Sequence, residues 1–189
     1  MRLAFRTLCA AVVFPAALMA QQAVTPAATS PKVGDVAPDF TLAAGTMAGI
    51  SAKSVKLSDL KGRTVVIAFY PRQRSGGCTI QMKAYRDKYT EVFGGGKDVT
   101  LLAVSTDSVK DIASWATEEK FPFTMLSDVD GTAGKLYATL APGGRYERRI
   151  VFVVAPSGKI SYVMNPFREV DPTSYEELTK AIHDAKGAK

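Results

Sequence analysis

The chain has 189 residues, of which 47% are hydrophobic and 22% charged, a composition typical of a globular protein with one well-formed core. Lysine and arginine outnumber aspartate and glutamate by 24 to 18, which gives a formal net charge of +6. The basic residues are scattered and form no long run, so we expect no nucleic-acid partner.

The N-terminus has the features of a secretory signal peptide. Arg2 and Arg6 precede an apolar stretch from Leu8 to Met19, and small residues follow it. This stretch is short for a membrane span, so we expect residues 1–20 to be cleaved and the protein to be exported to the periplasm, without stable membrane insertion. A retained membrane anchor is the alternative.

Cleavage after residue 20 would remove Cys9 and leave Cys78 as the single cysteine. An exported chain with one cysteine forms no internal disulfide, so the odd thiol indicates a reactive group or pairing between molecules. Residues 21–32 are rich in Ala, Thr, Pro and Gln and predict a flexible linker. Residues 33–185 then form one domain.

Three β-branched runs predict buried strands, namely Val65–Phe69, Thr100–Ser105 and Ile150–Val154. The last run continues through a turn at Gly158 into residues 159–163, as a hairpin does.

Helical spacing predicts three helices. The first follows Cys78 through Ile80–Phe93 and stops at Gly94–Gly96, the second covers Ser108–Lys120, and the third covers Thr173–Ala185. Strand, helix and strand in succession imply a parallel pair, and the hairpin adds antiparallel strands. The fold class is therefore α/β, with a central mixed β-sheet flanked by helices on both faces.

Cys78 lies between the end of a buried strand and the start of a helix, where active groups of such sheets gather. A thiol reacts as its thiolate, which free N–H groups at a helix start and nearby cations stabilise. Arg72, Arg74 and Arg86 are the cations near Cys78 in sequence. Gly76 and Gly77, beside the thiol, leave room for a small molecule to approach the backbone.

Pro71, Ser75 and Cys78 fit the pattern P-x-x-x-[T/S]-x-x-C, and with them the chain resembles the peroxiredoxins of the AhpC/TSA superfamily. The similarity extends from "VGDVAPDFTL" through "VKLSDLKGRTVVIAFYP" and the segment that starts at "AVSTDSVKD" to "RRIVFVVAPSGKI". The subgroup it resembles is the bacterioferritin comigratory protein or PrxQ type.

The resemblance implies a thioredoxin-like fold and thiol-dependent reduction of hydrogen peroxide and organic hydroperoxides, without cofactor or metal. It implies that Cys78 is the peroxidatic cysteine, that Ser75 and Arg149 bind the peroxide, and that Pro71 shields the site. The backbone N–H groups of Gly77 and Cys78 would stabilise the transition state.

Two positions depart from the family pattern. Many relatives place a resolving cysteine where this chain has Lys83, so the resemblance implies a one-cysteine cycle completed by an external thiol, a thioredoxin-like protein or glutathione. Gly76 replaces a common proline. The subgroup is often monomeric, so we expect a monomer, with a dimer as the alternative.

Simpler interpretations remain beside these. Ser75 is also suited to cap the helix, and Pro71 to end the strand. Neighbouring strand residues point to opposite faces, so a shift of one residue would make Arg148 rather than Arg149 the active-site arginine.

The single histidine, His183, falls on the surface of the last helix, and no Cys/His cluster predicts a metal site. The alternative function is a redox-inactive thioredoxin-fold binding protein. A thiol–disulfide exchanger is less suited, because exchange uses a second thiol that this chain lacks.

Overall fold

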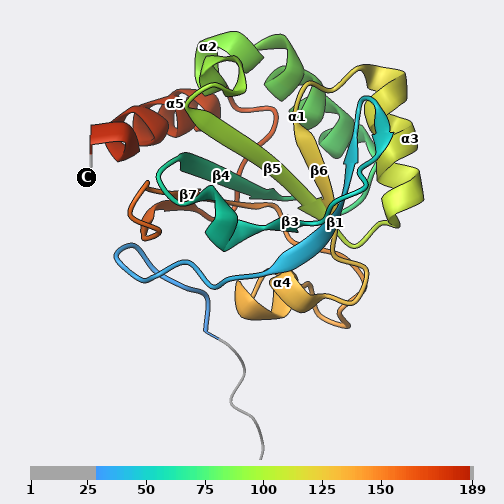
Figure 1. The fold of residues 1–189 in the computed structure, drawn as a ribbon, viewed down its shortest axis with the longest axis horizontal. Coiled ribbons are helices and arrows are strands. Elements are labelled where there is room, and N and C mark those ends of the chain that lie inside the picture. Colours follow the sequence, from blue (N-terminus) through green and yellow to red (C-terminus); the bar gives the residue numbers. More distant parts are fainter. Residues whose placement is uncertain (1–28, 188–189) are drawn as a thin grey trace, which may run out of the picture.

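Eight strands form one mixed sheet in this computed structural model, which describes residues 29–187 (Figure 1). The strand order is β2-β1-β6-β5-β4-β7-β8, with β3 beside β1. The strands are β1 (Thr41–Thr46), β2 (Gly49–Ile50), β3 (Val55–Lys56), β4 (Thr64–Phe69), β5 (Val99–Ser105), β6 (Thr124–Ser127), β7 (Ile150–Val154) and β8 (Ile160–Met164). The central strands β4, β5 and β6 are parallel, and β1, β7 and β8 pair antiparallel, which confirms the mixed sheet.

The strand β4 shows why this sheet is covered on both faces. Val66 and Ala68 point into one buried cluster, and Val65, Ile67 and Phe69 point into the other. All six residues of β4 are buried, as expected for a strand that reads as a continuous apolar run.

The helices are unequally distributed over the two faces. They are α1 (Gly76–Asp87), α2 (Tyr89–Phe93), α3 (Val109–Glu119), α4 (Thr132–Leu136) and α5 (Pro172–Gly187), with short 3-10 turns η1 (Leu57–Leu60) and η2 (Gly94–Gly96). Helices α1, α2, α3 and α5 share one buried cluster, whereas α4 and η1 pack on the opposite face. In Figure 1, α1 and α2 lie above the sheet, α5 at its upper left and α3 to its right, whereas α4 lies below it.

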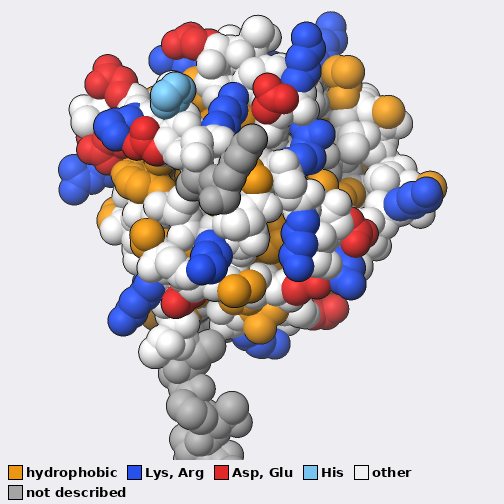
Figure 2. All heavy atoms as spheres, turned by 60° about the vertical axis from the view of Figure 1, so that its left-hand side comes forward, with side chains coloured by type: hydrophobic (Ala, Val, Ile, Leu, Met, Phe, Trp, Pro, Cys, Tyr) orange, Lys and Arg blue, Asp and Glu red, His pale blue; other side chains and the backbone are white. Residues whose placement is uncertain are grey.

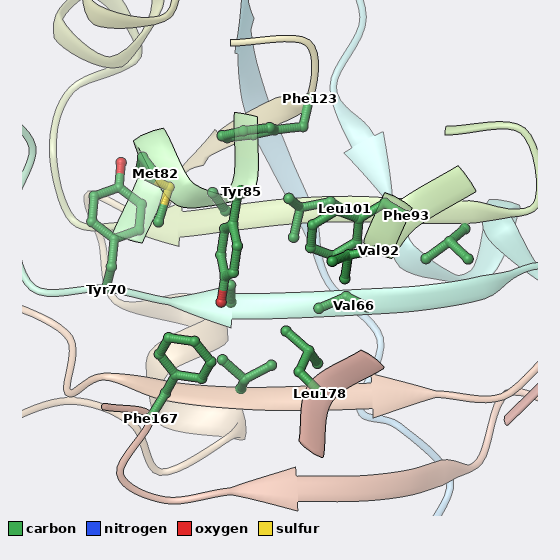
Figure 3. Close-up of a cluster of buried hydrophobic side chains, with 14 of the residues drawn as sticks. Val66, Tyr70, Met82, Tyr85, Val92, Phe93, Leu101, Phe123, Phe167 and Leu178 are labelled. Carbon is green, nitrogen blue, oxygen red and sulfur yellow. The ribbon is translucent and has the colours of Figure 1, made fainter. Parts of the chain in front are cut away.

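The larger cluster holds α1 against the sheet. Met82 and Tyr85 of α1 lie beside Phe93 of α2, Leu178 of α5 and Val66 of the sheet (Figure 3). The Tyr85 ring meets Phe93 edge to face, with ring centroids 5.4 Å apart. This packing fixes the helix that carries Cys78.

The helix predicted through Phe93 is two helices. Lys88 leaves helical geometry at φ −100° and ψ 15°, so α1 ends there and α2 begins at Tyr89. The stop at Gly94 is confirmed, because this glycine adopts the left-handed conformation at φ 59°. Gly158 likewise turns the hairpin with φ 83°, and Ser108 caps α3 by accepting the Asp111 N–H.

Figure 2 shows one face of the molecule, on which lysine and arginine side chains lie dispersed among uncharged and acidic groups. His183 is exposed, as expected. Within residues 29–187, no helix has both the length and the apolar content needed to cross a membrane. The signal and most of the linker predicted for residues 1–32 lie outside the described residues.

Candidate active site around Cys78

Cys78 is the third residue of α1 and is fully buried. The first intrahelical bond runs from the Thr79 N–H to the Ser75 carbonyl over 2.8 Å. The N–H groups of Gly77 and Cys78 precede this bond and have no partner within the described chain. The thiol therefore lies where backbone donors and the positive end of the helix dipole favour negative charge.

Arg149 brings a fixed positive charge to this thiol from a segment that is distant in sequence. It directly precedes β7, whose Ile150 pairs with Phe69 at the end of β4, so Arg149 lies at the edge where β4 leads into α1. Its Nη2 atom donates to the Cys78 sulfur over 3.4 Å.

The register also settles where the neighbouring arginine points. Arg148 donates its backbone N–H to Thr139 over 2.7 Å and its guanidinium to the carbonyl of Ala138. Alternation along the extended chain therefore sends Arg148 away from Cys78 and brings Arg149 to it.

Sequence reasoning missed Gln81, which anchors Arg149. Gln81 is fully buried, its side-chain oxygen accepts from Nη1 of Arg149, and its amide donates to the Tyr85 hydroxyl over 2.9 Å. Burial raises the pKa of Tyr85 well above its ordinary value, so the phenol stays neutral. The sequence does contain a signal for Gln81, because a polar residue three positions after Cys78 lies on the same, buried face of the helix.

Glu169 was also missed. Its carboxylate Oε2 lies 3.1 Å from the Nε atom of Arg149, and both side chains are largely buried, with exposed fractions of 24% and 13%. Glu169 lies on the irregular segment between β8 and α5, where no periodic pattern marks a functional position. Each guanidinium nitrogen of Arg149 thus faces one partner: the thiol, Gln81 or Glu169.

Pro71 and Ser75 bound the loop from β4 to α1. Ser75 is the N-cap residue by backbone geometry, but its hydroxyl donates to the Arg72 carbonyl over 3.0 Å and makes no capping bond. The loop is tied to the sheet where the Gln73 N–H donates to Asp107 over 2.7 Å. The capping role considered for the Ser75 side chain is therefore not what this conformation shows.

Two of the three arginines near Cys78 in sequence are engaged elsewhere. Arg74 pairs with Glu118 at 2.7 Å, and Arg86 pairs with Glu119 at 3.2 Å, both on α3. Nearness in sequence does not bring these two arginines to the thiol, because α3 carries the acids that pair with them. Lys83, at the position of the resolving cysteine in many relatives, is 3.1 Å from Glu119.

The remaining features do not extend the site. No group of three or more histidine, cysteine, aspartate or glutamate side chains is arranged for a metal ion within residues 29–187. A cavity of about 180 Å³ is lined by Leu57, Val65 and Val154, which belong to the cluster on the sheet face opposite Cys78. That cavity takes no part in chemistry at the thiol.

The sequence is similar to a known protein family and to curated relatives. The sequence profile described as the AhpC/TSA family matches residues 33–163. The peroxiredoxin Bcp of Escherichia coli K12 is 33% identical over 143 residues, covering 72% of this chain and 87% of that protein. The chloroplastic peroxiredoxin Q of Oryza sativa subsp. japonica is 34% identical over 139 residues, covering 70% of this chain and 58% of the rice protein.

Solved structures show the same fold. The crystal structure of Enterococcus faecalis AhpC superposes with a TM-score of 0.72 at 22% identity, covering 84% of this chain and 94% of that one. BcpB from Mycobacterium tuberculosis superposes with a TM-score of 0.67 at 24% identity, covering 82% and 97%. With the helix-borne cysteine and the sequence matches above, the chain belongs to the AhpC/TSA family and is a peroxiredoxin of the Bcp and peroxiredoxin Q type.

Proposed function

We propose that this protein is a thiol-dependent peroxidase that reduces hydrogen peroxide and organic hydroperoxides through a sulfenic acid at Cys78. The observation that carries the proposal is the contact of 3.4 Å between Arg149 Nη2 and the Cys78 sulfur at the start of α1. An arginine stays charged at any relevant pH, so it stabilises the thiolate and still has N–H groups for an incoming peroxide.

The bound peroxide is oriented by donors from two directions. The N–H groups of Gly77 and Cys78 come from α1, and the guanidinium of Arg149 comes from the residue before β7. The Ser75 hydroxyl rotates from the Arg72 carbonyl to the peroxide, and Pro71 limits access of water. These fixed dipoles act where negative charge develops on the departing oxygen.

In the chemical step, the thiolate attacks one oxygen of the hydroperoxide. A sulfur–oxygen bond forms, the O–O bond breaks, and the electron pair leaves with the second oxygen as hydroxide or alkoxide. That oxygen takes a proton to become water or an alcohol. Cys78 is oxidised to sulfenic acid while the peroxide is reduced.

Two external thiols complete the cycle. The first attacks the sulfenic acid, forms a mixed disulfide and releases water, and the second displaces the Cys78 thiol and leaves as a disulfide. Cys78 is the sole cysteine within residues 29–187, so a thioredoxin-like protein or glutathione supplies these thiols to a monomeric enzyme.

The decisive test follows Cys78 itself. Reduced protein is mixed with a slight excess of hydrogen peroxide, and oxidation is followed by stopped flow and mass spectrometry of the peptide that contains Cys78. We expect rapid gain of one oxygen atom, absent in Cys78→Ser, and reduction by added thiol. Oxidation no faster than that of a free thiol would favour the redox-inactive binding protein instead.

We further propose that residues 1–20 direct export and that the enzyme works in the periplasm. Support comes from the sequence, in which Arg2 and Arg6 precede the apolar stretch. N-terminal sequencing of protein recovered from a periplasmic extract should begin at Gln21. Recovery of the intact chain from the membrane fraction would point to a retained anchor.

A further inference from the structure

Glu169 places a negative charge directly beside the reactive thiol. Its Oε2 is 3.1 Å from Nε of Arg149, the residue whose Nη2 contacts Cys78. The other carboxylate oxygen lies over the first turn of α1, because a methyl group built on Gly77 would overlap it and would meet Arg149 Nη2 at 3.0 Å. The carboxylate thus occupies the place between Arg149 and the helix start that suits an anion.

This position is held by the chain around it. The Phe167 N–H donates to the Arg149 carbonyl over 2.9 Å. This bond holds the segment after β8, which carries Glu169, beside Arg149. The Tyr175 hydroxyl of α5 donates to the Glu169 carbonyl over 2.8 Å. These two bonds hold the backbone at Glu169, and the ion pair with Arg149 holds its carboxylate in the site.

The charges around Cys78 disfavour the approach of an anionic reagent. A thiolate at Cys78 and the carboxylate of Glu169 are both negative, and Arg149 is the single cation in contact with them within the described residues. The nearby Arg74 is neutralised by Glu118 at 2.7 Å. The thiolate, the carboxylate and Arg149 together carry a net negative charge, whereas Arg72, the other arginine near Cys78 in sequence, is exposed to solvent. An anionic reagent at Cys78 is therefore repelled in a partly buried setting, where repulsion is screened less than in water.

We propose that Glu169 is a specificity-determining residue that makes Cys78 selective for uncharged hydroperoxides over anionic ones. This proposal rests on the peroxidase function for its substrate class, although the charge selectivity at Cys78 is a property of the folded chain alone. The substrates favoured are hydrogen peroxide and neutral alkyl hydroperoxides. Peroxides that carry their charge next to the O–O bond, such as peroxymonosulfate, are disfavoured.

The first experiment measures charge selectivity without a peroxide. The full chain, Glu169→Gln and the control Glu176→Gln are alkylated with neutral iodoacetamide and with anionic iodoacetate, and mass spectrometry follows the Cys78 peptide. Glu176 is exposed on α5, so the control removes the same charge away from the site. We expect the rate ratio of iodoacetamide to iodoacetate to fall about threefold to thirtyfold in Glu169→Gln and to stay at the wild-type value in the control.

A merely structural role for Glu169 predicts a different change in the ratio. If Glu169→Gln only displaced Arg149, the site would lose the cation that attracts an anionic reagent, so the ratio of iodoacetamide to iodoacetate would rise or stay the same instead of falling, which would overturn the proposal. A ratio that changes equally in Glu176→Gln would also overturn it, since a long-range effect of net charge would then suffice. Added salt should weaken the wild-type discrimination.

The second experiment repeats the comparison with hydrogen peroxide and peroxymonosulfate as oxidants. We expect Glu169→Gln to gain rate with the anionic oxidant relative to the neutral one. If wild-type oxidation by hydrogen peroxide is slow while the alkylation ratio shifts as expected, the peroxidase function fails and the charge selectivity stands. If oxidation is fast but neither ratio shifts, the selectivity fails and the peroxidase function stands.

Discussion

The guanidinium of Arg149 donates to the sulfur of Cys78 across 71 positions of sequence. The pairing of Phe69 with Ile150 between β4 and β7 makes this contact possible, because it brings the residue before β7 to the end of β4. The reactive centre is therefore a product of sheet register as much as of the local motif.

Replacing Arg149 with glutamine should slow oxidation of Cys78 by hydrogen peroxide about 100-fold or more, because a charged donor at the reacting atoms is lost. Arg148→Gln is the matched control, since Arg148 contacts Ala138 instead, and we expect its rate to stay within about twofold of wild type. Stopped-flow oxidation measures both. Equal losses in the two variants would contradict the assignment of Arg149.

Much of the fold could be predicted because its central strands are β-branched runs buried on both faces. The strand Ile150–Val154 was predicted with its observed bounds. The four-residue β6 and the Ala- and Gly-containing β1 were not predicted as strands from their own residues, because neither forms a long β-branched run. The break at Lys88 was missed, since apolar spacing continues across it.

The site residues also fall into those that the sequence indicates and those that only the structure reveals. Pro71, Ser75 and Cys78 lie close together in sequence, and the resemblance to the peroxiredoxin motif indicates all three. The choice of Arg149 over Arg148 needed the strand register, which sequence alone leaves open by one residue. Glu169 reaches the site from an irregular segment, so only the packing between β8 and α5 reveals it.

Ser75→Ala should slow peroxide reduction about tenfold, the equivalent of one hydrogen bond to the substrate. The hydroxyl makes no capping bond, so the free energy of unfolding should fall by less than the approximately 1 kcal/mol that a lost cap costs. Rate measurements and urea unfolding separate these effects. The control Ser75→Thr keeps the hydroxyl and should retain most of the rate. A stable Ser75→Ala variant with the full wild-type rate would show that the Ser75 hydroxyl plays no part in the reaction.

Lys83→Cys should create a resolving cysteine. Five residues along a helix rise about 7.5 Å, beyond the Cα separation of a normal disulfide. A bond from position 83 to Cys78 therefore requires α1 to unwind. In a Cys9→Ser background, one equivalent of peroxide should give an internal disulfide and lower helical circular dichroism. The Cys9→Ser parent should instead gain one oxygen.

Lys83→Ala is the control for the lost ion pair with Glu119. Both partners are partly exposed, so the free energy of unfolding should change by less than about 1 kcal/mol. A disulfide that forms in Lys83→Cys with unchanged circular dichroism would contradict the need for α1 to unwind.

Gly77→Ala should disturb the carboxylate of Glu169 and the guanidinium of Arg149 together, because the added methyl group would overlap the carboxylate and would lie 3.0 Å from Arg149 Nη2. We expect oxidation of Cys78 to slow at least about tenfold, as the donors lose their alignment. Gly76→Ala is the matched control, since its methyl group would meet no atom within 4 Å. Similar rates in the two variants would show that the close approach at Gly77 is dispensable.

Glu147 should make stability depend on pH. It is buried, and this burial together with the negative charge of Asp128 raises its pKa from an ordinary value of 4.5 to about 7. The folded state thus holds a proton that the unfolded state releases at lower pH. The stabilisation is full below pH 4.5 and is lost as the pH rises to about 7, where the folded protein also ionises.

Glu147→Gln keeps the shape of the side chain and removes this titration. At pH 7.5 its free energy of unfolding should exceed that of wild type by about 1–3 kcal/mol, and the advantage should shrink towards pH 4.5. Two groups lower the pKa of Glu147: Thr139 donates a hydrogen bond to the Glu147 carboxylate over 2.6 Å, and Arg148 carries a positive charge. The stability gained in Glu147→Gln should therefore be smaller than burial alone would give. Urea unfolding between pH 4.5 and pH 7.5 tests this prediction, with Glu176→Gln as the exposed control. If the free energy of unfolding depends on pH in the same way in wild type and Glu147→Gln, then Glu147 is ionised in the folded protein throughout this range.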